Sequence, residues 1–219
     1  MSKVTLVGIT KPLIEGVESA EELIAYAARV SNPANQHNMD TAPKLLKYLI
    51  SNNHWSPLEM VSATMEIETT RDIARQILRH RSFSFQEFSQ RYARADQLDF
   101  QYREARLQDN KNRQNSIETD DRELANEWLD RQARLLVQIK EDYNWALSNG
   151  IAKEQARAVL PEGITGSRLY MAGTIRSWVH YIQLRRANGT QKEHQIIALQ
   201  AEAELVKHFP SLSFIFGDQ

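Results

Sequence analysis

A stretch of alternating residues that runs directly into a helical pattern constrains the fold of this chain most. Apolar and polar side chains alternate over residues 61–68, which is the period of a strand with one buried face. From Thr70 onward the apolar residues Ile73, Ile77 and Leu78 recur at helical spacing instead. A half-buried strand joined directly to a helix predicts a mixed α and β fold.

The same two periods predict the other elements of the chain. Residues 3–10 are expected to form a strand, and residues 83–92 an extended, partly β segment. Helices are expected over residues 19–30, 40–49, 120–150, 153–160, 167–187 and 190–209, with capping-box spacing at Ser19 and Thr190. We therefore predict an α+β fold, in which a small, largely antiparallel sheet from the N-terminal half is packed by helices and the C-terminal portion is helical.

The length of 219 residues predicts one domain, spanning residues 1–219. Residues 108–121 are polar and almost free of apolar side chains, so a mobile loop is expected there. The N-terminal residues lack the pattern of a signal peptide, and no window approaches the roughly 20 apolar residues of a membrane span. We expect a cytoplasmic protein that does not associate with membranes.

Arginine is the residue type that points to a ligand. The chain has 18 arginines and 9 lysines, although its net charge is only −1. Arg71, Arg75 and Arg79 are spaced to lie along one helical face, and residues 79–92 combine further arginines with serines, aromatics and a carboxylate. For a single arginine a solvated surface ion pair is the simpler interpretation, but this density indicates an anion-binding site.

Several common site signatures are missing from the sequence. There are no cysteines, which excludes disulfides and a cysteine nucleophile. The eight glycines form no phosphate-binding loop and the six histidines have no regular metal-ligand spacing, so we expect no metal site. Phosphates would have to be bound by arginines.

The residues then show a family resemblance. Residues 79–84 (Arg-His-Arg-x-x-Ser), continued by residues 87–92 (Glu-x-Ser-x-Arg-Tyr), resemble the signature of the flavin-dependent thymidylate synthases. Residues 54–59 resemble the family's flavin-side loop, and residues 156–161 followed by 176–185 resemble its C-terminal half. The resemblance covers most of residues 45–209.

The resemblance implies conversion of dUMP to dTMP, with methylenetetrahydrofolate as one-carbon donor and NADPH as reductant through FAD. It also implies a homotetramer whose active sites are shared between subunits. By position, the dUMP contacts would be Gln76, Ile77, Leu78, Arg79, Glu87, Phe88, Ser89, Gln90, Arg91, Arg157 and Arg185. The FAD contacts would be Ser56, Arg79, His80, Arg81, Glu87, Thr174, Ile175, Arg176 and His180. Arg157 would bind the phosphate.

Arg185 would face the uracil ring as the catalytic residue. Its charge would stabilise an N3-deprotonated, electron-rich pyrimidine, which is the activation a chain without a cysteine nucleophile needs. The sequence departs from the family's fuller pattern at Met60, Gln86, Thr174 and His180. These departures concern individual flavin contacts and leave the arginines unchanged.

Two other classes of function remain open at this point. The arginines interleaved with Phe83, Phe85, Phe88 and Tyr92 would suit a single-stranded nucleic-acid-binding protein, although the net charge of −1 counts against it. A helical interaction module with solvated arginines is the other alternative. His54 and His180 would then be hydrogen-bonded interior histidines, and Trp178 with Tyr181 would be core packing.

Overall fold

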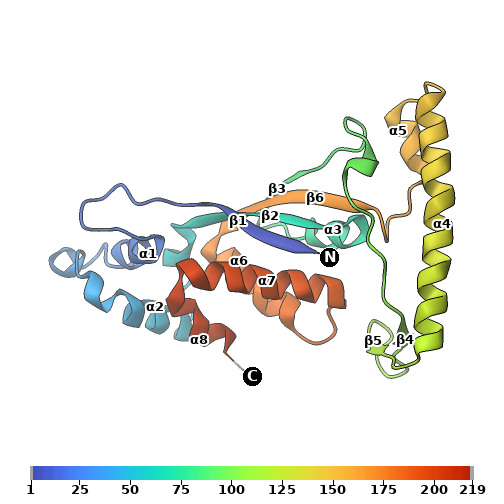
Figure 1. The fold of residues 1–219 in the computed structure, drawn as a ribbon. Coiled ribbons are helices and arrows are strands. Elements are labelled where there is room, and N and C mark those ends of the chain that lie inside the picture. The colour runs from blue at the N-terminus through green and yellow to red at the C-terminus, as the bar shows by residue number, and fades with distance from the viewer. Residues whose placement is uncertain (1, 218–219) are drawn as a thin grey trace.

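The computed structural model describes residues 2–217 (Figure 1). The strands are β1 (Lys3–Ile9), β2 (Ser62–Thr70), β3 (Ser84–Glu87), β4 (Arg106–Gln108), β5 (Ser116–Glu118) and β6 (Gly166–Thr174). The α-helices are α1 (Ala20–Ala28), α2 (Ala42–Ser51), α3 (Arg71–Ile77), α4 (Arg122–Ser148), α5 (Lys153–Ala156), α6 (Ile175–Arg186), α7 (Lys192–His208) and α8 (Ser213–Phe216). Two of the short 3₁₀ helices matter for the site: η3 (Ser56–Glu59) and η5 (Arg157–Val159).

The main sheet has four strands in the order β1-β2-β6-β3, and each neighbouring pair is antiparallel. This confirms the predicted α+β fold with a small antiparallel sheet. The predicted helix over residues 167–187 is wrong in its first half, because residues 166–174 form the inner strand β6. A strand from the C-terminal half thus lies between β2 and β3, where the hydrogen bonds to both neighbours fix its extended conformation.

The core lies on one face of this sheet. Met65 and Ile67 of β2 and Leu169 and Met171 of β6 are fully buried, and α6 and α7 cover them in Figure 1. Trp178 of α6 is also fully buried, and its indole Nε1 donates to the carbonyl of Ala63 in β2 (3.1 Å). Helix α6 is therefore anchored to the sheet by both apolar packing and a hydrogen bond.

The two predicted capping boxes have different outcomes. The Ser19 hydroxyl accepts from the Glu22 amide and the Glu22 carboxylate accepts from the Ser19 amide, as predicted for the start of α1. The box at Thr190 is wrong, because α7 begins after Gln191 without a side-chain cap. Glu193, the expected partner, instead accepts a hydrogen bond from Arg106 (2.6 Å). A charged hydrogen bond to an arginine is stronger than one to a backbone amide, so the Glu193 carboxylate contacts Arg106 and not the start of α7.

The long helix α4 stands at one end of the molecule, beside the sheet rather than beneath it (Figure 1). Its second half packs against α5 and the loop after β3 in a small separate cluster of Ala95, Tyr143, Ala146 and Ala156. Strands β4 and β5 pair as a short hairpin within the stretch where a mobile loop was expected. Three hydrogen-bonding residues on each side are enough to make a regular element from a polar sequence.

Gly166, at the start of β6, is a position where the fold excludes a side chain. A Cβ there would lie 2.5 Å from the Asp99 carbonyl oxygen and 3.0 Å from Leu98 Cβ. Gly166→Ala is expected to lower the free energy of unfolding by about 1–3 kcal/mol through overpacking. Urea unfolding measures this, with Gly163→Ala as control because nothing lies within 4 Å of its Cβ position. Equal stability of the two variants would contradict the packing argument.

Candidate active site

A cavity of about 640 Å³ opens where α3 ends, where α6 ends and where α7 begins. Gln76 and Arg79 reach it from the end of α3, Arg185 from the last turn of α6 and Gln191 from the residue before α7. Its other lining residues are Asp72, Arg75, Gln114, Glu162, Gly189 and Thr190. The structure therefore brings together three residues predicted from the sequence: Gln76, Arg79 and Arg185.

The arginines of the cavity differ in whether a carboxylate neutralises them. Arg75 forms ion pairs with Glu87 (3.4 Å) and Glu162 (3.8 Å). Arg79 and Arg185 form no ion pair with any carboxylate among residues 2–217. Because no carboxylate neutralises them, the guanidinium groups of Arg79 and Arg185 are available to bind an anionic ligand.

The prediction that Arg71, Arg75 and Arg79 lie along one face of a single helix is wrong for Arg79. The helix ends at Ile77, so Arg79 lies beyond it in the following turn. Arg71 is buried and contacts Glu87 (3.8 Å) and Glu162 (3.4 Å). Like charges along one helical face repel, and here Glu87 and Glu162, which each pair with both Arg71 and Arg75, offset that repulsion.

His80 holds Arg185 in place. The Arg185 Nε donates to His80 Nε2 (2.9 Å), and the His80 ring packs edge-on against Tyr181 with centroids 4.9 Å apart. Burial, and then the charge of Arg185, lower the pKa of His80 to about 4. His80 is thus neutral near pH 7, and its Nε2 lone pair accepts from Arg185 while the two terminal nitrogens of the guanidinium remain available.

Glu87 ends β3 outside the lining of this cavity. It is held there by the Ser167 hydroxyl, which donates to Oε1 (2.9 Å), and by Arg71 and Arg75. Glu87 thus pairs with two neighbouring arginines. A ligand role for it stays a prediction.

A second group of predicted dUMP contacts lies at the α5 end of the molecule. Arg91 Nε pairs with Glu154 of α5 (3.2 Å), and Arg157 Nε in η5 donates to the carbonyl of the same Glu154 (3.3 Å). Ser89 lies in the loop leading to Arg91, and its carbonyl accepts from Ala93 (2.9 Å). None of these residues lines the cavity of Arg79 and Arg185. One chain therefore divides its predicted dUMP contacts between two places.

A third group gathers the predicted flavin contacts at the start of α6. Thr174 caps this helix by accepting from the Ser177 amide (3.2 Å). Arg176 pairs with Glu59 of η3, and the His180 ring packs edge-on against Trp55 at 4.6 Å between centroids. Ser56 is the first residue of η3. These contacts bring η3 and α6 together as one surface.

Several predicted contacts are buried. Ile77 and Ile175 are fully buried in the core, so only their backbone atoms can reach a ligand. The Phe88 amide donates to the Arg168 carbonyl (2.8 Å) and continues the sheet. Gln90 is buried, and its Nε2 has no hydrogen-bond partner. Leu78 caps the end of α3.

His80 and Arg81 lie in the turn after α3. The exposed Arg81 forms no ion pair among residues 2–217. Phe83, which the nucleic-acid interpretation would expose for base stacking, is buried against Trp178 at 4.9 Å between ring centroids. The aromatics of residues 83–92 thus do not form one exposed stacking platform.

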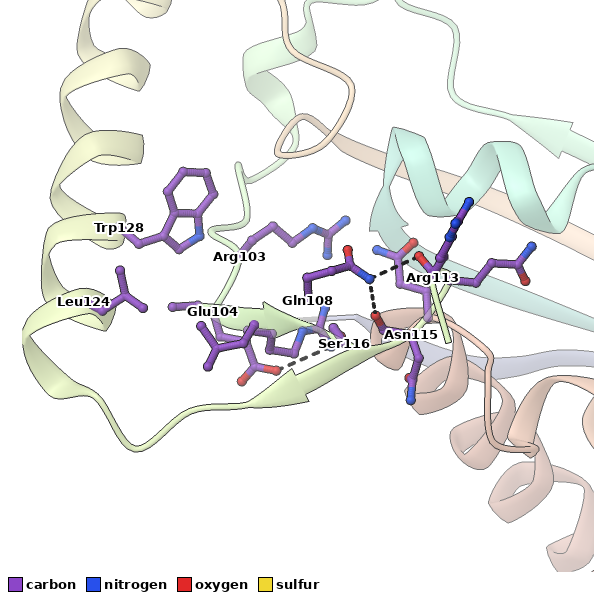
Figure 2. A pocket seen from close by; sticks show the side chains of 13 residues that line it. Arg103, Glu104, Gln108, Arg113, Asn115, Ser116, Leu124 and Trp128 are labelled. Atoms are coloured by element: carbon purple, nitrogen blue, oxygen red, sulfur yellow. Dashed lines mark hydrogen bonds and ion pairs between the residues drawn. The ribbon is translucent and has the colours of Figure 1, made fainter. Parts of the chain in front are cut away.

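A second cavity, of about 670 Å³, lies between the β4–β5 hairpin and α4. Figure 2 shows Leu124 and Trp128 extending from α4 on one side, with Arg103 and the hairpin residue Gln108 opposite. Gln114 and Gln191 line both cavities, which are therefore adjacent. Sequence reasoning missed this cavity, because its hairpin was expected to be a mobile loop.

The buried His194 and the half-buried His80 should make stability depend on pH. Burial and the charge of Arg185 lower the pKa of His194 to about 3 and that of His80 to about 4. The histidines of the unfolded chain take up protons near pH 6.5, whereas those of the folded chain do not. The free energy of unfolding is therefore highest above that pH and decreases as the pH falls toward 4. Each histidine contributes a slope of up to about 1.4 kcal/mol per pH unit.

Urea unfolding of His194→Asn between pH 7.5 and pH 5 measures this slope. The variant should lose less stability on acidification than the parent protein, because asparagine does not titrate. His208→Asn is the control, since His208 is exposed on the last turn of α7. An identical loss in all three proteins would contradict the burial argument.

Metal binding and membrane insertion are two further properties on which the described residues bear. Across residues 2–217, no group of three His, Asp or Glu side chains is arranged to hold a metal ion. Within the same residues, no helix is long and apolar enough to cross a membrane.

The fold and the cavity together define the class of an α+β protein that presents arginines to an anionic ligand. A family model described as "Thymidylate synthase complementing protein" matches residues 12–211. A probable flavin-dependent thymidylate synthase of Paramecium bursaria Chlorella virus 1 is 53% identical over 208 residues, covering 95% of each chain. The flavin-dependent thymidylate synthase of Synechocystis sp. is 50% identical over 214 residues, covering 96% of this chain and 97% of that one.

Solved structures agree with these sequence matches. The UMP/dUMP methylase PolB of Streptomyces cacaoi, bound with 5-Br dUMP, superposes with a TM-score of 0.79 at 26% identity, covering 97% of this chain and 95% of that one. The chain belongs to the flavin-dependent thymidylate synthase family. The resemblance seen in the sequence is thereby confirmed, and the nucleic-acid alternative finds no support in these matches.

Proposed function

We propose that the protein converts dUMP to dTMP in the cytoplasm, with methylenetetrahydrofolate as one-carbon donor and NADPH as reductant through FAD. The observation that carries this proposal is the cavity in which Arg79 and Arg185 have no carboxylate partner among residues 2–217. All four ligands are anionic and favour such guanidinium groups. The family relationship supplies the reaction.

Each dUMP site is formed by two subunits of a homotetramer in this proposal. Gln76, Arg79 and Arg185 line one cavity, whereas Arg91 and Arg157 meet at Glu154 elsewhere in the chain. If all five residues bind one nucleotide, the second group has to come from another subunit. The exposed apolar side chains of α4, Leu124, Trp128, Leu135, Val137 and Trp145, support association of subunits along this helix.

Arg185 activates the uracil ring in this proposal. Its Nε is held by His80 (2.9 Å), which fixes the plane of the guanidinium. The two terminal nitrogens then form a planar pair of donors, which matches the carbonyl and deprotonated N3 of a uracil edge. Stabilising that negative charge makes the ring electron-rich without a covalent enzyme nucleophile.

The third group of residues fits a flavin dinucleotide. Its donors are Arg176, His180 and the Ser56 hydroxyl, which suit a pyrophosphate, a ribityl chain and ring carbonyls. Partial burial, and then the nearby Arg176, lower the pKa of His180, which favours the neutral imidazole with one donor and one acceptor. Bound FAD would supply reducing equivalents from NADPH. Arg176 would exchange its contact with Glu59 for one with the cofactor.

Formation of dTMP is the direct test of the proposed reaction. The purified protein should produce dTMP, measured by chromatography, when dUMP, methylenetetrahydrofolate, NADPH and FAD are all present. Leaving out any one of the four should stop the reaction. Product formation without NADPH or FAD would contradict the proposed cofactors, and no product from the complete mixture would contradict the proposed reaction.

A further inference from the structure

A continuous chain of hydrogen bonds runs from the buried core into the cavity. The hydroxyl of Tyr181 lies 3.1 Å from His194 Nε2. His194 Nδ1 lies 3.2 Å from Gln76 Oε1, and Gln76 Nε2 donates to Gln191 Oε1 (2.8 Å). Gln191 Nε2 then donates to Glu193 Oε2 (2.9 Å). Both His194 and Tyr181 are almost completely buried, whereas Gln76 and Gln191 line the cavity.

The chain has only one possible direction, because it ends on a carboxylate. Burial favours a neutral Glu193, but the hydrogen bond from Arg106 (2.6 Å) and the nearby Arg103 outweigh this and lower the pKa of Glu193. A carboxylate only accepts. Gln191 must therefore turn its amide nitrogen to Glu193 and its oxygen to Gln76.

The same logic fixes the remaining members. Since Gln191 offers an oxygen, Gln76 must offer its nitrogen in that direction and turn its own oxygen toward His194. His194 Nδ1 therefore carries the proton and donates. Burial keeps His194 neutral near pH 7, so its Nε2 is an acceptor and Tyr181 is the donor to it.

The fixed direction determines what Gln76 offers to a ligand. Its amide nitrogen has two hydrogens, and only one of them is used by Gln191. Its oxygen is held by a buried histidine and cannot exchange places with the nitrogen without leaving Nδ1 of His194 unsatisfied. The second N–H of Gln76 is the group left for the cavity that it shares with Arg185.

We propose that His194, supported by Tyr181, is a positioning residue that orients Gln76 so that its amide N–H donates to a carbonyl oxygen of the bound pyrimidine. This inference rests on the proposed function, which places the uracil ring in the cavity of Arg185. It adds two buried residues, outside every predicted contact, to the recognition of the substrate.

A double-mutant cycle on dUMP binding tests whether His194 acts through Gln76. His194→Leu should raise the dUMP dissociation constant by roughly tenfold, the effect of one misdirected neutral hydrogen bond. In a Gln76→Ala background the same substitution should have no further effect. His194→Asn should restore most of the affinity, because its amide nitrogen can replace Nδ1 as donor. Tyr181→Phe, a smaller change, should weaken binding in the same direction.

Urea unfolding verifies that each variant is folded before binding is measured. The affinity for deoxyuridine, which lacks the phosphate, should fall by the same factor as the affinity for dUMP when His194 is replaced by leucine. The inference would be overturned by any of three results. His194→Leu could lower the affinity equally in the Gln76→Ala background, it could leave the dissociation constant unchanged while folded, or it could lower the affinity for dUMP but not for deoxyuridine. Failure of the parent protein to bind dUMP would instead reject the proposed function.

Discussion

Replacing Arg185 by lysine is expected to lower kcat by about a hundredfold, the usual cost of removing a donor aimed at developing charge. Lysine keeps the positive charge but lacks the planar fork, and it cannot both bond His80 and present two parallel donors. The dUMP dissociation constant should rise by less than about tenfold, as for one lost hydrogen bond. Steady-state and single-turnover rates, with dUMP titration of the oxidised enzyme, separate the two effects.

Arg186→Lys is the matched control for Arg185→Lys. Arg186 is the next residue of α6, but it pairs with Glu202 (3.1 Å) and does not line the cavity. Its rates should stay close to those of the parent enzyme. If Arg185→Lys left the single-turnover rate unchanged, Arg185 would be a binding contact only and its catalytic assignment would be wrong.

Mixed subunits should recover activity that neither variant has alone. Arg157→Ala and Arg185→Ala are each expected to be nearly inactive alone. The assay uses a dUMP concentration well below the dissociation constant that each variant has for dUMP. If a site takes Arg157 from one chain and Arg185 from another, random co-assembly leaves about a quarter of the sites with both arginines. Refolding the two variants together and assaying dTMP formation measures this recovery.

Arg79→Ala mixed with Arg185→Ala is the control for this experiment. Both residues line the same cavity of one chain, so every site formed from this mixture lacks one of the two arginines. No recovery is expected from that pair. Recovery by the Arg79 pair but not by the Arg157 pair would contradict the proposed division of the site.

The sequence predicted those elements that carry a clear periodic or capping pattern of their own. The alternation over residues 61–68 became β2, and the reciprocal Ser19 and Glu22 contacts start α1. Strand β6 was missed because its extended form depends on pairing with β2 and β3, which are about 80 to 100 residues earlier in the chain. Residues 166–174 also lack the regular apolar and polar alternation of residues 61–68, so only the assembled sheet identifies them as a strand.

The candidate site shows the same limit. Family resemblance named Gln76, Arg79 and Arg185, and the structure brings these three together. It could not name His194, since its partner Gln76 is 118 positions away in the sequence. A lone histidine on an apolar helix face is ordinarily a core residue. The residues next to His194 in the sequence do not show that this histidine orients a ligand contact.

Anaerobic reoxidation of the reduced flavin tests the central claim most directly. Enzyme loaded with FAD and reduced by NADPH should be reoxidised only when both dUMP and methylenetetrahydrofolate are added, with about one dTMP formed per flavin as the proposed stoichiometry requires. The flavin absorbance and the product are followed in the same sample. Reoxidation without dUMP, or complete reoxidation with no dTMP formed, would contradict the assignment of this chain as a thymidylate synthase that works through its flavin.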